Sequence, residues 1–92
     1  MRYIDVRWHH AHDDEPVRLI SEIDGSGFET RKLEFYRDGR VGWAERCGSH
    51  LGTDLGIEPV PSLAEINKDP QFMGVELEAV AFEVLWKQHA IG

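Results

Sequence analysis

The sequence has few of the features that stabilise secreted proteins or place a chain in a membrane. Cys47 is the single cysteine among 92 residues, so an internal disulfide is excluded. No run of about 18 apolar residues occurs, which excludes an ordinary transmembrane helix. The first residues, MRYIDVRW, lack the apolar stretch of a signal peptide. We therefore expect a cytoplasmic protein without membrane partners.

Basic residues are also scarce. Ten Lys and Arg stand against seventeen Asp and Glu, which gives a formal net charge of −7. Residues 47–92 have two basic and seven acidic side chains, so the second half carries most of the imbalance. Because acidic surfaces repel phosphate backbones, nucleic-acid binding is disfavoured, whereas encounter with a basic protein is favoured. The glycines in residues 48–56 are not followed by the helix and lysine of a phosphate-binding loop, and we expect no cofactor.

The strongest structural signal is the stretch LEFYRDGRVGWAE at residues 33–45. Apolar residues alternate on both sides of Asp38-Gly39, a pair that tolerates the backbone angles of a tight hairpin turn. Similar alternation predicts strands at residues 3–10 and 17–24. With strands at about 28–37 and 40–45, the simplest arrangement is a four-stranded antiparallel meander.

The second half of the chain changes character. Residues 46–58 have little periodicity and are expected to be irregular. Ser62 and Glu65 form the pattern of a capping box, which predicts a short helix near residues 63–67. We assign residues 72–77 to a short extended segment.

A longer helix is expected at residues 78–89, because Phe82, Leu85 and Trp86 share one helical face. The predicted fold is a single α+β domain over residues 1–92. It is a four- to five-stranded antiparallel meander sheet with a C-terminal helix packed on one face and a short helix near residues 63–67.

Alternation also predicts which side chains share a face of the sheet. We expect the C-terminal helix to cover an apolar face made by Ile4, Val6, Trp8, Val17, Leu19, Ile23, Leu33, Phe35, Val41 and Trp43. The opposite face is then an ordinary solvated surface, is covered by residues 46–72, or serves as an interface, since Tyr and Arg are frequent in interface cores. The predicted binding surface on that face comprises Tyr3, Arg7, His9, Arg18, Lys32, Glu34 and Tyr36.

The polar stretch after the first strand is a second candidate site. Residues 9–15 contain three histidines and three acids, and imidazole and carboxylate groups bind Zn²⁺ and similar metals. A polar hairpin loop accounts for the same residues, so we assign no metal and keep His10, His12 and Asp14 as the alternative. The local pair of Cys47 and His50 lacks an oxyanion-hole signature, and we assign no catalytic residue.

Five pieces of the sequence together resemble a family of small, uncharacterised bacterial domains of unknown function. They are YIDVRWHH, DEPVRLISEID, ETRKLEFYRDGRVGWA, GTDLGIEPVPSLAEINKDPQF and FEVLW, and they cover nearly the whole chain. The resemblance implies an extended, acidic segment at residues 72–77 followed by a helix. The chain differs from the family pattern at the start of this helix, where Glu78-Ala79 replaces a Ser or Thr. The resemblance implies no activity and no catalytic residues.

Two classes of function agree with these observations. The first is a non-catalytic protein that acts through protein–protein interaction, for example an immunity-like or antitoxin-like inhibitor of a basic partner. This example rests on analogy with other small acidic bacterial proteins. Formation of a homodimer is another use of the same surface. The alternative is a small metal-dependent hydrolytic enzyme that uses the cluster from His9 to Asp14.

Overall fold

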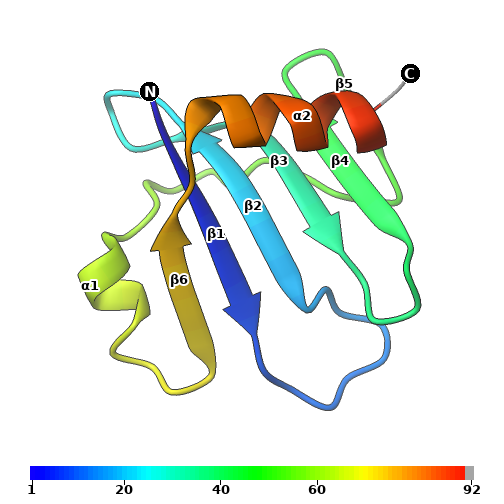
Figure 1. Cartoon of the computed structure of the whole chain (residues 1–92), viewed down its shortest axis with the longest axis vertical. Helices are drawn as coiled ribbons and strands as arrows, with labels where there is room; N and C mark the ends of the chain where they lie inside the picture. Colours follow the sequence, from blue (N-terminus) through cyan, green and yellow to red (C-terminus); the bar gives the residue numbers. More distant parts are fainter. Residues whose placement is uncertain (91–92) are drawn as a thin grey trace.

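The computed structural model of the protein describes residues 1–90 and shows one six-stranded antiparallel sheet accompanied by two helices (Figure 1). The strand order is β5-β4-β3-β2-β1-β6. The elements are β1 (Arg2–Trp8), β2 (Arg18–Ile23), β3 (Glu29–Phe35), β4 (Val41–Glu45), β5 (Gly48–His50), α1 (Leu63–Ile66), β6 (Phe72–Glu76) and α2 (Ala79–His89). The predicted α+β fold is confirmed: β1 to β5 form a meander, and β6 adds to the edge beside β1. The short β5 lies in the stretch that the sequence predicts to be irregular.

The hairpin between β3 and β4 turns at the predicted Asp38-Gly39 pair. The Tyr36 amide donates to the Arg40 carbonyl (2.9 Å), and the Gly39 amide donates to the Tyr36 carbonyl (3.1 Å). Gly39 has a φ of 96°, a left-handed conformation that glycine adopts without steric cost. Asp38 Oδ1 accepts a further hydrogen bond from the Arg40 amide (3.0 Å). Asp38 and Gly39 therefore have separate roles, one as a hydrogen-bond acceptor and the other as the left-handed residue.

The predicted assignment of side chains to the two faces of the sheet is wrong. Leu33 of β3 lies opposite Ile20 of β2, whereas Val6 of β1 lies opposite Leu19. Because side chains alternate along each strand, Leu33 and Val6 point to opposite faces. Alternation assigns the side chains of each strand to two sides. It does not show which of these sides shares a face with a given side of the next strand, because a one-residue change of register exchanges the two sides. The apolar residues of the first hairpin therefore lie on the opposite face from those of the second.

The face under α2 contains a core centred on Ile20, Leu33 and Phe82, each 0 % exposed. Partly buried side chains surround these three: Tyr3, Phe35, Val41, Trp43, Leu77, Leu85, Trp86 and Ala90. The helix crosses this face near one end of the strands (Figure 1). The predicted helix and its apolar face are confirmed, with Glu78 as the residue before the first turn. Within residues 1–90, neither helix has the length and apolarity needed to cross a bilayer.

A second cluster forms on the opposite face, which is covered in part by residues from the stretch 46–72, one of the three predicted alternatives. We call residues 51–71, the segment between β5 and β6, the strap. The strap places α1 on this face, and Ser62 Oγ accepts a hydrogen bond from the Glu65 amide (3.2 Å), as the capping pattern predicts. Apolar side chains of the strap and of β6 pack against the buried side chains beneath them: Val60, Leu63, Ile66 and Phe72 against Ile4, Val6 and Ile23. Both faces of the sheet are therefore covered in part.

Asn67, the residue after α1, holds the strap against the edge strand β6. Its Oδ1 accepts a hydrogen bond from the Gly74 amide (2.6 Å), and its Nδ2 donates to the Gly74 carbonyl (3.0 Å). A side chain at Gly74 would collide with the strap, since a Cβ there would lie 2.8 Å from Leu63 Cδ2. Glycine at this position and the asparagine amide together allow the strap to cover part of the sheet edge.

Candidate functional site

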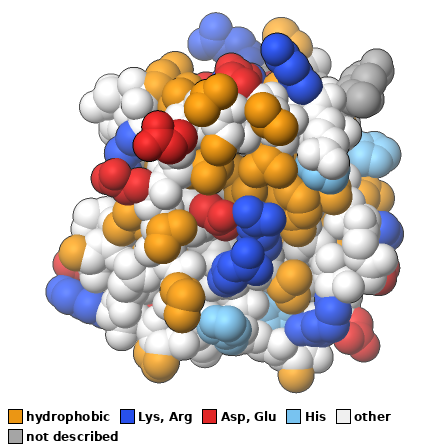
Figure 2. Space-filling model, in the orientation of Figure 1, with side chains coloured by type: hydrophobic (Ala, Val, Ile, Leu, Met, Phe, Trp, Pro, Cys, Tyr) orange, Lys and Arg blue, Asp and Glu red, His pale blue; other side chains and the backbone are white. Residues whose placement is uncertain are grey.

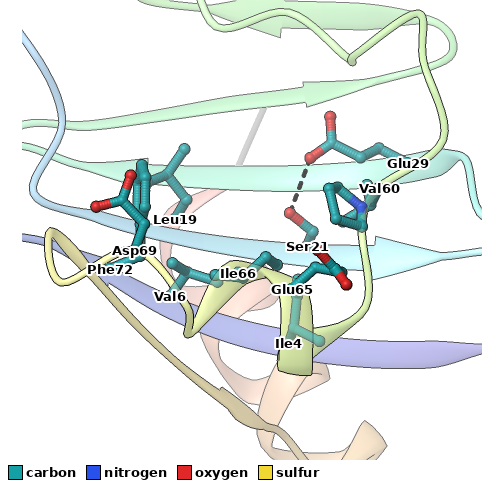
Figure 3. Close-up of a pocket in the computed structure, with 11 residues that line it drawn as sticks. Ile4, Val6, Leu19, Ser21, Glu29, Val60, Glu65, Ile66, Asp69 and Phe72 are labelled. Carbon is teal, nitrogen blue, oxygen red and sulfur yellow. Dashed lines mark hydrogen bonds between the residues drawn. The ribbon is translucent and has the colours of Figure 1, made fainter.

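A cavity of about 500 Å³ lies between the strap and the sheet face opposite α2 (Figure 3). Most of its walls are apolar: Ile4, Val6, Leu19, Val60, Pro61, Ile66 and Phe72. Four polar side chains also line it: Ser21, Glu29, Glu65 and Asp69. This volume is within the range of about 300–1,000 Å³ typical of pockets that bind small molecules.

The cavity arises where the strap crosses β2. On the β4 side, Thr53 is 1 % exposed and packs so closely on Gly42 that no larger side chain would fit there. On the β6 side, Leu63 approaches Gly74 so that a Cβ there would lie 2.8 Å from Leu63 Cδ2. Between these two contacts the strap does not fill the space over Leu19, which is only partly buried.

Glu29 anchors the strap at one end of the cavity. One carboxylate oxygen accepts a hydrogen bond from the Ser21 hydroxyl (2.9 Å), and the other accepts from the Gly56 amide (2.7 Å). Lys32 Nζ lies 3.4 Å from the second oxygen. Because both oxygens are paired and only 8 % of the side chain is exposed, the carboxylate is part of the pocket wall. Its bond to Ser21 is visible in Figure 3.

The strap and the residues that follow it are acidic. Residues 51–78 contain six acidic side chains and one basic side chain, Lys68. All six acids belong to exposed residues: Asp54, Glu58, Glu65, Asp69, Glu76 and Glu78. Glu65 and Asp69 line the cavity itself. Most of the net negative charge of the chain therefore belongs to the strap, to β6 and to the residues that follow β6.

The predicted binding surface is not one surface in the structure. Tyr3, Arg7 and Arg18 lie on the face that carries α2, whereas Lys32 and Glu34 lie on the cavity face. The reason is the exchange of faces described above: alternation was correct within each strand but not between the first and second hairpins. Figure 2 views the α2 side, where basic side chains lie among hydrophobic ones below the helix.

On the α2 side, two of the three predicted residues have structural contacts. Tyr3 packs against Phe82, with ring centroids 5.0 Å apart. Arg18 makes a two-point ion pair with Asp5 (2.7 and 3.0 Å). Arg7 is exposed beside these groups. A binding role for these residues stays a prediction.

The other four predicted residues lie in different places, with Lys32 and Glu34 together on the cavity face. Glu34 Oε1 accepts a hydrogen bond from the Thr53 hydroxyl (2.9 Å), so it helps to hold the strap, and Lys32 lies near both Glu29 and Glu34. His9 and Tyr36 lie just beyond the ends of β1 and β3. Burial raises the pKa of Tyr36, and the Arg40 guanidinium lies 5.0 Å from its ring centroid.

A charged network that the sequence did not identify joins α2 to the sheet. Arg31 makes paired hydrogen bonds to Glu22 (2.6 and 2.9 Å) and to Glu83 of α2 (2.8 and 3.0 Å). The Arg31 guanidinium also lies over the rings of Phe82 and Trp86. Hydrogen bonds from Arg31 lower the pKa of Glu22 to about 2, and they lower the pKa of Glu83 as well. Every member has a partner, so the network explains how α2 is attached rather than indicating catalysis.

The histidine cluster forms a folded loop. The His10 Nδ1 atom accepts a hydrogen bond from the His12 amide (3.0 Å), so in a neutral ring Nε2 carries the proton and donates to the Pro16 carbonyl (2.8 Å). Both ring nitrogens of His10 are thus engaged. Within residues 1–90, no group of three or more His, Cys, Asp or Glu side chains has an arrangement suited to a metal ion.

The cavity itself was missed by the sequence analysis. Three of its apolar residues, Ile4, Val6 and Leu19, were predicted to be core under the long helix, and Glu65 was predicted only as part of a short helix. One signal was available, because β2 has apolar residues at neighbouring positions, Leu19 and Ile20. This pattern indicates a strand covered on both faces.

Comparison with known proteins supplies a family but no activity. The model of a domain of unknown function, DUF6881, matches residues 2–91. No curated protein and no solved structure gives a significant match. Because the match spans nearly the entire sequence, the chain belongs to the DUF6881 family of domains of unknown function.

Proposed function

We propose that this protein is a non-catalytic bacterial protein of the cytoplasm that binds a basic protein partner through the face covered by the strap. The observation that carries the proposal is the placement of charge. Six exposed acids and one basic residue lie in residues 51–78, and two of these acids, Glu65 and Asp69, line the apolar cavity. An acidic field beside an apolar pocket supplies both steering and contact area for a basic protein.

The more specific form of the proposal is an inhibitor of the immunity or antitoxin type. Such a protein acts by occupying a basic functional surface, and this requires a stable acidic face but no catalytic group. The hydrogen bonds from the strap to Glu29 and Glu34 hold this face in one conformation, which lowers the entropic cost of binding. The analogy with other small acidic inhibitors is one of chemistry, and the partner is defined here by its positive charge.

Two charge variants of equal net charge test the proposal. The first changes Asp54→Asn, Glu58→Gln and Glu76→Gln on the cavity side. The control changes Asp13→Asn, Asp14→Asn and Glu15→Gln in the exposed β1–β2 loop. Each variant loses three negative charges, so a difference between them reports where the partner binds.

The experiment is affinity capture from the source cell at about 0.05 and 0.3 M salt, where surface attraction is screened to different extents. A captured protein is then purified and its affinity for the wild type and both variants is measured by titration. We expect a basic partner whose binding weakens with salt, falls several-fold with the cavity-side variant and is retained by the loop variant. Equal loss in the two variants, or a captured partner that is acidic and insensitive to salt, would contradict the proposal.

A further inference from the structure

We propose that the cavity under the strap is an anchor pocket that takes one apolar side chain, flanked by basic residues, from the partner. This inference rests on the proposed function and names the chemistry of the segment that is bound. It assigns separate tasks to two features of one face. The cavity selects an apolar side chain, and the acids around it select the charge of its neighbours.

The lining of the cavity suits an apolar occupant. Seven of its eleven lining residues are apolar, and the hydroxyl of Ser21 is already bonded to Glu29. Within residues 1–90, no buried side-chain nitrogen or oxygen atom lacks a hydrogen-bond partner. An apolar group that enters the cavity therefore leaves Ser21 and Glu29 paired, and it gains the free energy of removing its own surface from water.

The rim of the cavity suits positive charge next to that apolar group. Glu65 and Asp69 line the cavity and are exposed. The Glu65 carboxylate is paired with Lys68 (3.0 Å), but both side chains are more than half exposed, and exposed pairs of this kind are weak. The Asp69 carboxylate accepts one hydrogen bond from the Gln71 amide (2.9 Å) and has further capacity as an acceptor. Lysine or arginine side chains on either side of the anchor would lie within reach of both carboxylates.

Charge also argues against a second copy of this chain as the occupant. Two copies that met through this face would bring two acidic segments together, each with six acids and one base in residues 51–78. Like charges placed opposite one another at an interface are costly. A basic segment of another protein fits the same face without that repulsion.

The test uses short peptides of defined composition. The probe is an acetylated, amidated pentapeptide with phenylalanine between two pairs of lysines. One matched peptide has alanine in the central position, and another has glutamate in place of every lysine. Binding is followed by NMR shifts of methyl groups and amides in the labelled protein, with contacts from the phenylalanine ring measured to the methyl groups of Ile4, Leu19 and Ile66.

We expect the phenylalanine peptide to bind at least about tenfold more tightly than the alanine peptide, from the area of the ring that is buried. Its ring protons should contact the cavity methyl groups, and the glutamate peptide should not bind measurably. Glu65→Gln combined with Asp69→Asn should weaken both lysine peptides by the same factor. Glu45→Gln, an exposed acid on β4, should leave both affinities unchanged.

A filled cavity provides the decisive variant. Leu19→Trp places a larger side chain into the space over β2 and should remove the difference between the phenylalanine and alanine peptides. Val84→Trp, at a residue 61 % exposed on α2, is the matched control and should retain it. If Leu19→Trp does not fold, as judged by its thermal melt, Ile66→Phe fills the same cavity from the strap.

The outcomes separate this inference from the proposed function. Equal affinity of the phenylalanine and alanine peptides, with shifts confined to the acidic residues, overturns the anchor pocket while leaving recognition of a basic partner intact. Tighter binding of an uncharged alcohol such as 1-hexanol than of hexylammonium would identify a pocket for small apolar molecules and overturn the inference. Absence of peptide binding to the wild type overturns it as well, whereas failure of the proposed function appears in the charge variants.

Discussion

Acidification provides a direct test of the network that attaches α2 to the sheet. Glu22 is only 6 % exposed, and its carboxylate accepts hydrogen bonds from Arg31 and from the Thr30 hydroxyl (2.7 Å). These bonds lower its pKa from 4.5 to about 2. We predict that a measurable part of the folding free energy depends on the ionised state of this one group.

The magnitude follows from the size of the pKa shift. Each unit is worth about 1.4 kcal/mol, so the shift of Glu22 corresponds to about 3 kcal/mol. Because the pKa of this acid is lower in the folded state, the stabilisation is fully present above pH of about 4.5. It is lost as the pH falls from about 4.5 to about 2. A loss of this size is a large fraction of the ~5–15 kcal/mol typical of a folded domain.

The assay is urea unfolding monitored by tryptophan fluorescence at several pH values between 7 and 2.5. Glu22→Gln should lower the free energy of unfolding by about 2–3 kcal/mol at pH 7, since Arg31 keeps its second partner, Glu83. The variant and the wild type should converge towards pH 2.5, because protonation removes the same charge from the wild type. Glu58→Gln, which removes an exposed carboxylate, should follow the wild type. A constant difference between Glu22→Gln and the wild type at all pH values would refute the assignment of the acid-sensitive stability to Glu22.

Three further substitutions test other parts of the fold by the same unfolding assay. Asn67→Ala should lower the free energy of unfolding by about 1–3 kcal/mol, because it leaves the amide and carbonyl of the buried Gly74 without their hydrogen-bond partners. An unchanged unfolding midpoint would mean that water replaces these partners. Gly74→Ala should lower the free energy of unfolding by about 1 kcal/mol, because the new methyl group displaces the end of the Leu63 side chain and crowds Val6; a stabilised variant would contradict this close approach. Trp43→Ala should lower the free energy of unfolding by about 3 kcal/mol, since the partly buried indole packs edge-on against Trp86. A decrease of less than about 1 kcal/mol would place Trp43 outside the core.

The local structure could be predicted from the sequence wherever a few neighbouring residues determine it. The Asp38-Gly39 turn, the hydrogen bond from the Glu65 amide to Ser62 and the helix that begins after Glu78 depend on side chains within about one turn of each other. The relation between the two hairpins could not be predicted in the same way. It depends on the register between β2 and β3, which brings Leu33 opposite Ile20, and this register includes an irregularity at the end of β2. The alternation of residues within each strand does not predict this register.

The candidate site was less predictable than the fold, because it is formed by segments far apart in the sequence. Glu29 and Gly56 meet through one hydrogen bond that spans 27 residues, and neither residue type marks such a contact in advance. The sequence did indicate that the second half of the chain is acidic, and this property is retained in the structure as an acidic strap. The cavity beneath the strap is the space over the sheet that the strap does not fill. No pattern in the sequence predicts such a space.

The two faces of the sheet are attached to their covering segments by different means, and this difference favours the strap side as the binding side. α2 is joined by a buried core around Phe82 and by the paired hydrogen bonds of Arg31, so a ligand on that side would have to displace well-packed groups. The strap is attached near β3 mainly through hydrogen bonds to two carboxylates, Glu29 and Glu34. These bonds hold the strap at its margins and leave apolar area exposed to the cavity in between. An apolar side chain of a partner can therefore enter this face without unfolding any part of it.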